Sequence, residues 1–115
     1  MQSTPLDTHQ LKTFIELGFN DYREIFEDFA DQIPHYLDRI HNSIRDADTV
    51  AFKATVHSLR GIASLFGCIT LTQRLAQLEL KPELTNLIHS ELSSLWQGNL
   101  KALNAWEKSV PEFNA

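Results

Sequence analysis

The apolar residues of this chain recur every three or four positions over long stretches, which is the spacing of one face of an α-helix. The clearest stretch lies in the first half of the sequence and consists of Phe26, Phe29, Ile33, Leu37, Ile40 and Ile44. No segment is rich in strand-forming residues, and no internal repeat or low-complexity tract interrupts the pattern. The spacing therefore predicts an all-α fold.

Caps and prolines divide this pattern into five helices. We expect them at residues 7–17 (starting at residue 7 or 8), 21–45, 49–66, 70–80 and 82–110. Gly18 and Gly67 are suited to helix C-termini because glycine tolerates the left-handed conformation. Asp48 is a favourable N-cap for the third helix, and Pro82 is suited to the first turn of the fifth. Pro111 is expected to stop that last helix.

Four of the predicted helices are long and joined by short connections, which favours an antiparallel four-helix bundle. The short additional N-terminal helix is expected to pack across one end of the bundle. Pro34 lies inside the second helix and is expected to bend it, because proline removes one backbone donor. A chain of 115 residues without a linker-like tract is expected to form one domain over residues 1–115.

Composition narrows the classes of function. The net charge of −5 argues against general binding to nucleic acid, which needs a positive surface. No apolar run approaches the roughly 20 residues that span a bilayer, and the first residues do not resemble a signal peptide. Cys68 is the only cysteine and cannot form an internal disulfide, which favours a cytoplasmic setting. No P-loop or other Gly-rich nucleotide motif is present.

The third predicted helix carries a histidine opposite its apolar stripe. The stripe consists of Phe52, Val56, Leu59, Ala63 and Phe66. On a helical wheel, His57 points about 140° away from this stripe and therefore outward. Its side of the helix also carries Lys53, Arg60, Gly61 and Ser64. An exposed imidazole is nucleophilic near neutral pH, Arg60 can balance the charge of a phosphoryl group, and Gly61 leaves room for another protein.

A simpler interpretation of this face also stands. His57 could be an ordinary solvated histidine, and Gly61 could serve close packing between helices.

The arrangement resembles the histidine-containing phosphotransfer (HPt) family. The family motif is a histidine followed by a basic residue at the third place, a glycine at the fourth and a glycine at the tenth, which are here His57, Arg60, Gly61 and Gly67. Further similarities cover roughly residues 20 to 80 and include Pro34, Leu37, Ile40, Asp46-Ala47-Asp48, Leu59, Leu71, Leu78 and Glu79. The chain departs from the family by carrying Arg60 for the usual lysine, Ile62 where small residues are common and Cys68 where alanine is frequent.

The resemblance implies that His57 carries a phosphoryl group in a multistep two-component phosphorelay. A phospho-aspartate of one receiver domain would donate the group to Nε2 of His57, which would pass it to an aspartate of another. The expected partners are receiver domains of response regulators and hybrid sensor kinases. The chain is expected to act as a monomeric carrier with no cofactor and no ATP-dependent kinase activity of its own. Mg²⁺ is expected to be supplied by the receiver domain.

Glu79 matches the position from which family members accept a hydrogen bond from the histidine Nδ1–H. On the wheel it borders the apolar stripe of the fourth helix, so it can face a neighbouring helix. Such a bond would fix the tautomer and leave Nε2 free to attack. The alternative is that Glu79 is a solvated carboxylate.

Two other functions are compatible with this sequence. The main alternative is a helical binding module that docks on receiver domains or kinases without being phosphorylated, and a more distant one is a purely structural helical adaptor.

The remaining histidines are His9, His35, His41 and His89, and they show no metal-binding spacing with one another or with Cys68. Trp96 and Trp106 are expected in the core or at its edge, and Cys68 is expected to be a small packed residue.

Overall fold

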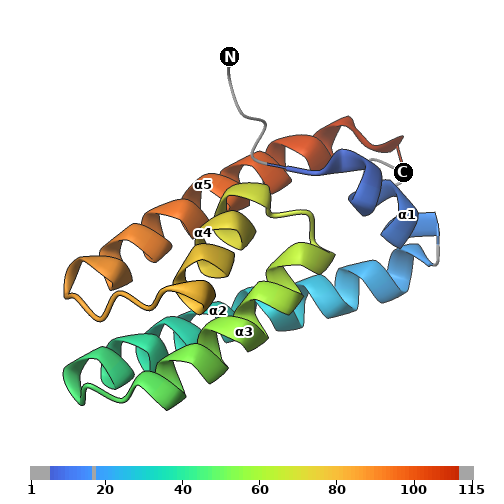
Figure 1. Cartoon of the computed structure of the whole chain (residues 1–115). Coiled ribbons are helices and arrows are strands. Elements are labelled where there is room, and N and C mark those ends of the chain that lie inside the picture. The colour runs from blue at the N-terminus through green and yellow to red at the C-terminus, as the bar shows by residue number, and fades with distance from the viewer. Residues whose placement is uncertain (1–5, 17, 112–115) are drawn as a thin grey trace.

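Five helices make up the computed structural model, which describes residues 6–16 and 18–111. They are α1 (Thr8–Glu16), α2 (Phe19–Arg45), α3 (Thr49–Leu65), α4 (Ile69–Leu80) and α5 (Leu87–Ser109), as Figure 1 shows. Within the described residues no strand occurs. The all-α prediction is confirmed, and α2 continues through Pro34 without a break. Leu17, the predicted last residue of the first helix, lies outside the described residues.

The helices α2 to α5 form a closed ring of neighbours. Helix α2 packs against α3, α3 against α4, α4 against α5, and α5 returns to α2. Successive helices run in opposite directions, and α1 packs on α2 and α3 at the end where α2 begins (Figure 1). The apolar stripes predicted for α2 and α3 are buried throughout their length. The structure is thus the expected antiparallel four-helix bundle with a short N-terminal helix.

Local chemistry explains where α3 begins and ends. Asp48 caps its N-terminus by accepting a hydrogen bond from the backbone N–H of Ala51 at 3.0 Å. Gly67 ends it with φ of 65°, and a Cβ there would lie 2.6 Å from the carbonyl oxygen of Asp7. The backbone N–H of Asp7 in turn donates to the carbonyl of Gly67 at 2.8 Å. Gly67 is therefore required by the fold, because its backbone is left-handed and a Cβ would collide with the N-terminal segment that pairs with the α3–α4 turn.

The start of the fifth helix differs from the prediction. Helix α5 begins at Leu87 instead of residue 82, and residues 81–86 form a non-helical connection. Arg74 of α4 pairs with Glu83 of this connection at 2.9 Å and also with Glu91 of α5. Leu84 packs against the core from the connection, whereas Leu87 is 77% exposed. These tertiary contacts hold the segment out of the helix that Pro82 alone would allow.

A buried asparagine stabilises the start of α4. Cys68, the N-cap residue, makes no side-chain capping bond. Instead, Oδ1 of the fully buried Asn99 in α5 accepts hydrogen bonds from the Thr70 hydroxyl at 3.1 Å and the Leu71 backbone N–H at 3.3 Å. The first N–H groups of a helix have no partner within it, so this amide replaces a local cap. The sequence gives no hint of this contact.

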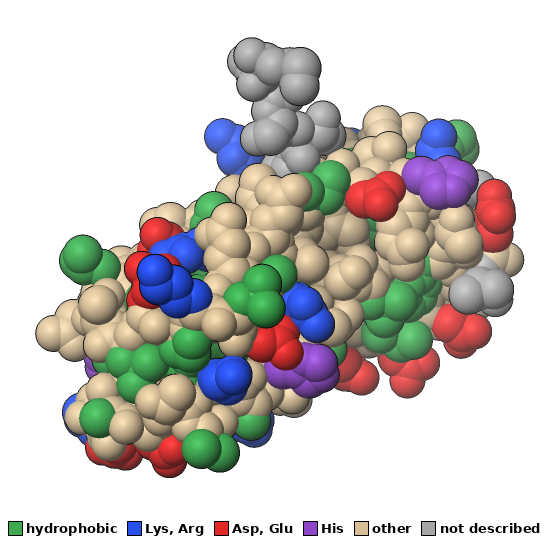
Figure 2. Space-filling view, viewed as in Figure 1, with side chains coloured by type: hydrophobic (Ala, Val, Ile, Leu, Met, Phe, Trp, Pro, Cys, Tyr) green, Lys and Arg blue, Asp and Glu red, His purple; other side chains and the backbone are tan. Residues whose placement is uncertain are grey.

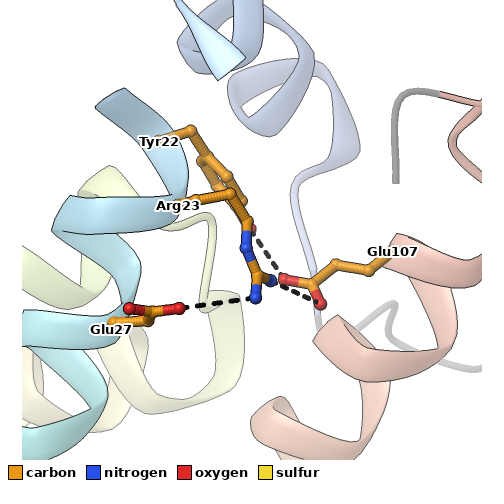
Figure 3. Close-up of polar contacts among 4 residues, drawn as sticks. All are labelled: Tyr22, Arg23, Glu27 and Glu107. Carbon is orange, nitrogen blue, oxygen red and sulfur yellow. Dashed lines mark hydrogen bonds and ion pairs between the residues drawn. The ribbon is translucent and has the colours of Figure 1, made fainter. Parts of the chain in front are cut away.

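A polar cluster joins α2 to α5 near the end covered by α1 (Figure 3). The Tyr22 hydroxyl donates to Oε1 of Glu107 at 3.4 Å, and Arg23 lies 3.5 Å from Oε2 of the same carboxylate. Arg23 also pairs with Glu27, one turn further along α2. Burial of the Glu107 carboxyl raises its pKa. Burial of the Tyr22 hydroxyl, together with the nearby negative charge of Glu107, raises the pKa of Tyr22 above its ordinary value.

Candidate functional site

Helix α3 presents His57 to solvent. Its apolar stripe faces the core, and the His57 side chain on the opposite side is 64% exposed. Lys53, Gly61 and Ser64 are exposed on the same face, and Arg60 is 39% exposed. Figure 2 shows a histidine at the surface over α3, with acidic and basic side chains beside it. The structure therefore brings together on one face the five residues that the wheel placed there.

Glu79 reaches His57 from the last turn of α4. One carboxylate oxygen, Oε1, lies 2.6 Å from Nδ1 of His57. The contact is possible because α4 packs directly against α3 and the Glu79 side chain is only 23% exposed. With its proton on Nδ1, the imidazole donates to the carboxylate and leaves the lone pair of Nε2 free. The arrangement suits nucleophilic attack by Nε2.

The second oxygen of the same carboxylate faces Arg60. The Nε atom of Arg60 lies 3.0 Å from Oε2 of Glu79, which forms an ion pair. Oε2 is shielded from solvent and accepts no hydrogen bond of regular geometry from the described residues. Glu79 thus stands between His57 and Arg60. Sequence reasoning missed this pair because it depends on how α3 and α4 are placed relative to each other.

Gly61 has no structural partner on this face. A Cβ built at Gly61 would meet nothing within 4 Å apart from its own helix and neighbours. The helix-packing interpretation of Gly61 is therefore wrong, since none of the other described helices comes within 4 Å of that Cβ position. Glycine in a helix interior costs about 1 kcal/mol relative to alanine, so the fold alone would favour a larger residue here.

The remaining candidates stay apart from this site. The rings of His41 in α2 and His89 in α5 lie 5.2 Å apart, a pairing that the sequence did not predict. In the described part of the chain, no three His, Cys, Asp or Glu residues are grouped so that they could hold a metal ion. Cys68 is buried, and burial raises the pKa of its thiol to about 12. This packed thiol matches its expected role.

Together the fold and the site define a class of protein: a four-helix bundle that presents an exposed, carboxylate-paired histidine beside an open glycine. The sequence matches the Hpt domain model over residues 24–106, most of the chain, and the chain belongs to this family. Hpt domains are phosphocarrier modules of two-component signalling, distinct from kinases, and they interact with receiver domains. Neither a curated protein nor a solved structure matches the chain. None of the described helices is long and apolar enough to span a bilayer.

Proposed function

We propose that this protein relays phosphoryl groups between aspartates of receiver domains through a phosphohistidine at His57. The observation that carries this proposal is the pairing of Nδ1 with Glu79 at 2.6 Å on a side chain that is 64% exposed. The pairing directs the free lone pair of Nε2 outward, and Gly61 leaves the adjacent surface open. A partner's aspartyl phosphate could therefore approach Nε2 along the face of α3.

The proposed transfer is a direct displacement at phosphorus. The lone pair of His57 Nε2 forms a bond to phosphorus while the bond from phosphorus to the aspartate oxygen breaks, and the aspartate leaves as a carboxylate. The ring keeps its proton on Nδ1 and gains positive charge as the N–P bond forms. The carboxylate of Glu79 is placed to stabilise that charge. Return of the group to a second aspartate reverses these steps.

The partner supplies what this chain lacks in the proposal. The protein acts as a monomeric carrier without a cofactor, and the receiver domain brings the Mg²⁺ that neutralises the phosphoryl oxygens. Arg60 is predicted to balance the negative charge of the phosphoryl group once His57 is phosphorylated. To do so, its guanidinium would have to contact the phosphoryl group while it remains paired with Glu79. Lys53, Gly61 and Ser64 border the surface over which the receiver would dock.

The second candidate function is a binding module that docks on receiver domains without being phosphorylated. It would use the same exposed face of α3 but would not need an ordered Nδ1 contact. The 2.6 Å pairing with Glu79 favours the phosphorylated form, because a pure docking surface gains little from fixing one imidazole tautomer.

The decisive experiment offers the purified protein a receiver domain that carries a radiolabelled phosphoryl group on its aspartate. We expect the label to move to His57 as a bond that is labile in acid and stable in alkali, as a phosphoramidate is. His57→Gln should abolish the transfer while helix content stays unchanged by circular dichroism. A His57→Gln protein that folds and accepts label as well as the parent would exclude His57 as the carrier.

Two controls separate the carrier from its alternatives. Incubation with ATP and Mg²⁺ alone should leave the protein unlabelled, since the sequence holds no recognisable nucleotide motif. The second control tests several receiver domains encoded in the same genome. If they bind the protein but none transfers its label, the result would favour the non-phosphorylated binding module.

A further inference from the structure

The two cations beside His57 differ in what they contact. Arg60 is engaged with the Glu79 carboxylate at 3.0 Å, although it lies one turn after His57 and could have pointed into solvent. Lys53, one turn before His57, is exposed and pairs with no acidic group among the described residues. The wheel assigns both cations to the same face, and only the structure separates them.

The contact of Arg60 has a physical consequence for His57. The Glu79 carboxylate has two oxygens: Oε1 contacts Nδ1 of His57, and Oε2 is shielded from solvent. A shielded anionic oxygen without a compensating charge is costly, so loss of Arg60 would favour rotation of the carboxylate toward water. Glutamate has three rotatable bonds, and the pairs at its two oxygens together restrict them. The orientation of the imidazole therefore depends on Arg60 through Glu79.

We propose that the two cations have separate roles: Arg60 is a positioning residue that acts on His57 through Glu79, and Lys53 is the cation that meets the incoming phosphoryl group. The proposal rests on the phosphotransfer function proposed above and revises the part assigned there to Arg60. While Arg60 is paired with Oε2 of Glu79, that carboxylate offsets part of the guanidinium charge, so Arg60 attracts a phosphoryl group less strongly than an unpaired cation would. Lys53 has no acidic partner among the residues that the structure describes, and its flexible side chain lets it follow an anion that approaches the α3 face.

A double-mutant cycle tests this division of roles by the rate of transfer from a labelled receiver domain. Arg60→Met and Lys53→Met are comparable changes, since each removes the charge and leaves an unbranched side chain that is a good helix former. Arg60→Met should slow transfer about three- to tenfold in the parent protein, the effect of losing one orienting contact, and less than about twofold in a Glu79→Ala background. Lys53→Met should slow transfer by a similar factor in both backgrounds.

Salt provides the second arm of the same experiment. The loss caused by Lys53→Met should shrink as ionic strength rises, because an exposed charge is screened within about 8–10 Å at ordinary salt. The loss caused by Arg60→Met should persist, because it reflects the orientation of His57. Equal losses for Arg60→Met with and without Glu79, or no loss at all, would overturn the positioning role. A Lys53→Met protein that transfers normally at low salt would overturn the role of Lys53.

A spectroscopic measurement keeps the positioning role testable even if no receiver domain labels His57. Ring-nitrogen chemical shifts of the isotope-labelled, unphosphorylated protein report which nitrogen carries the proton when the imidazole is neutral. We expect the Nδ1–H form in the parent and in Lys53→Met, and a mixture of both forms in Arg60→Met and Glu79→Ala. An unchanged Nδ1–H form in Arg60→Met would refute the positioning role of Arg60. Failure of labelling in the parent would refute the proposed function, and with it the role of Lys53, but would leave the positioning role of Arg60 standing.

Discussion

Two glycines of the motif around His57 have different physical causes. Gly67 has φ of 65° and no space for a Cβ, so the backbone of this fold requires it. Gly61 has ordinary helical geometry and open space around it, so nothing within the described chain requires it. The described residues therefore give no structural reason for Gly61, and the proposed approach of a receiver domain supplies one. Gly98 in α5 is equally open and offers a matched comparison.

Substitution of these two open glycines should separate stability from transfer. Gly61→Ala and Gly98→Ala should each raise the free energy of unfolding by about 0.5–1 kcal/mol, because alanine loses less backbone entropy in a helix and its Cβ meets nothing. Denaturant unfolding followed by circular dichroism measures both.

Larger side chains at the same positions test the docking face. Gly61→Gln should block transfer from a phosphorylated receiver while the bundle stays folded, and Gly98→Gln should leave the transfer rate unchanged. If Gly61→Gln accepts the label at the parent rate, the partner does not approach over this face of α3, even if His57 is the carrier.

At the scale of the elements, α4 is positioned by polar contacts that α5 supplies. Its first turn is capped by the buried Asn99, and Arg74 in its middle pairs with Glu91 of α5. Helix α4 also carries Glu79 in its last turn, so these contacts add to its packing against α3 in placing the carboxylate relative to His57. The site on α3 therefore depends on a helix that a third helix holds in place.

Asn99→Ala should lower the free energy of unfolding by about 1–3 kcal/mol, because it leaves the buried N–H of Leu71 without an acceptor. Asn104→Ala, on the exposed side of the same helix, is the matched control and should change stability by less than about 0.5 kcal/mol. Urea unfolding of the two variants gives the comparison. Equal effects of the two substitutions would mean that the cap from α5 contributes nothing.

At the scale of the whole molecule, two buried groups make the bundle sensitive to alkali. Burial raises the pKa of Cys68 from its ordinary value near 9 to about 12, and the pKa of Tyr22 is also raised. The folded state therefore holds these protons more tightly than the unfolded state does. Their contribution to stability is complete below pH 9 and is lost as the pH rises through the raised pKa values.

We accordingly expect the melting temperature of the parent protein to fall steeply between about pH 9 and pH 12. Cys68→Ala and Tyr22→Phe should each make that fall shallower, even though both lower the melting temperature at pH 7 through lost packing or hydrogen bonding. The readout is the slope of melting temperature against pH, followed by circular dichroism. Identical slopes in parent and variants would show that neither group controls the alkaline transition.

The sequence by itself determined the five helices apart from the start of α5, the apolar stripes of α2 and α3, and the face that presents His57. Apolar spacing is a local property, so the stripes of α2 and α3 and the outward direction of His57 could be predicted from helix geometry alone. Caps such as Asp48 act within one turn and were predictable for the same reason. The family resemblance added the pairing with Glu79, which wheel geometry permitted but could not select.

Tertiary structure decided everything that depends on where one helix stands relative to another. The start of α5 at Leu87, the cap that Asn99 gives to α4 and the ion pair between Arg60 and Glu79 each join residues from different elements. Helical periodicity fixes the direction of a side chain around its own axis but not the distance to its neighbour's. That distance is set by core packing, and here it brings Arg60 into an ion pair with Glu79. The sequence alone had assigned the charge of Arg60 to the phosphoryl group.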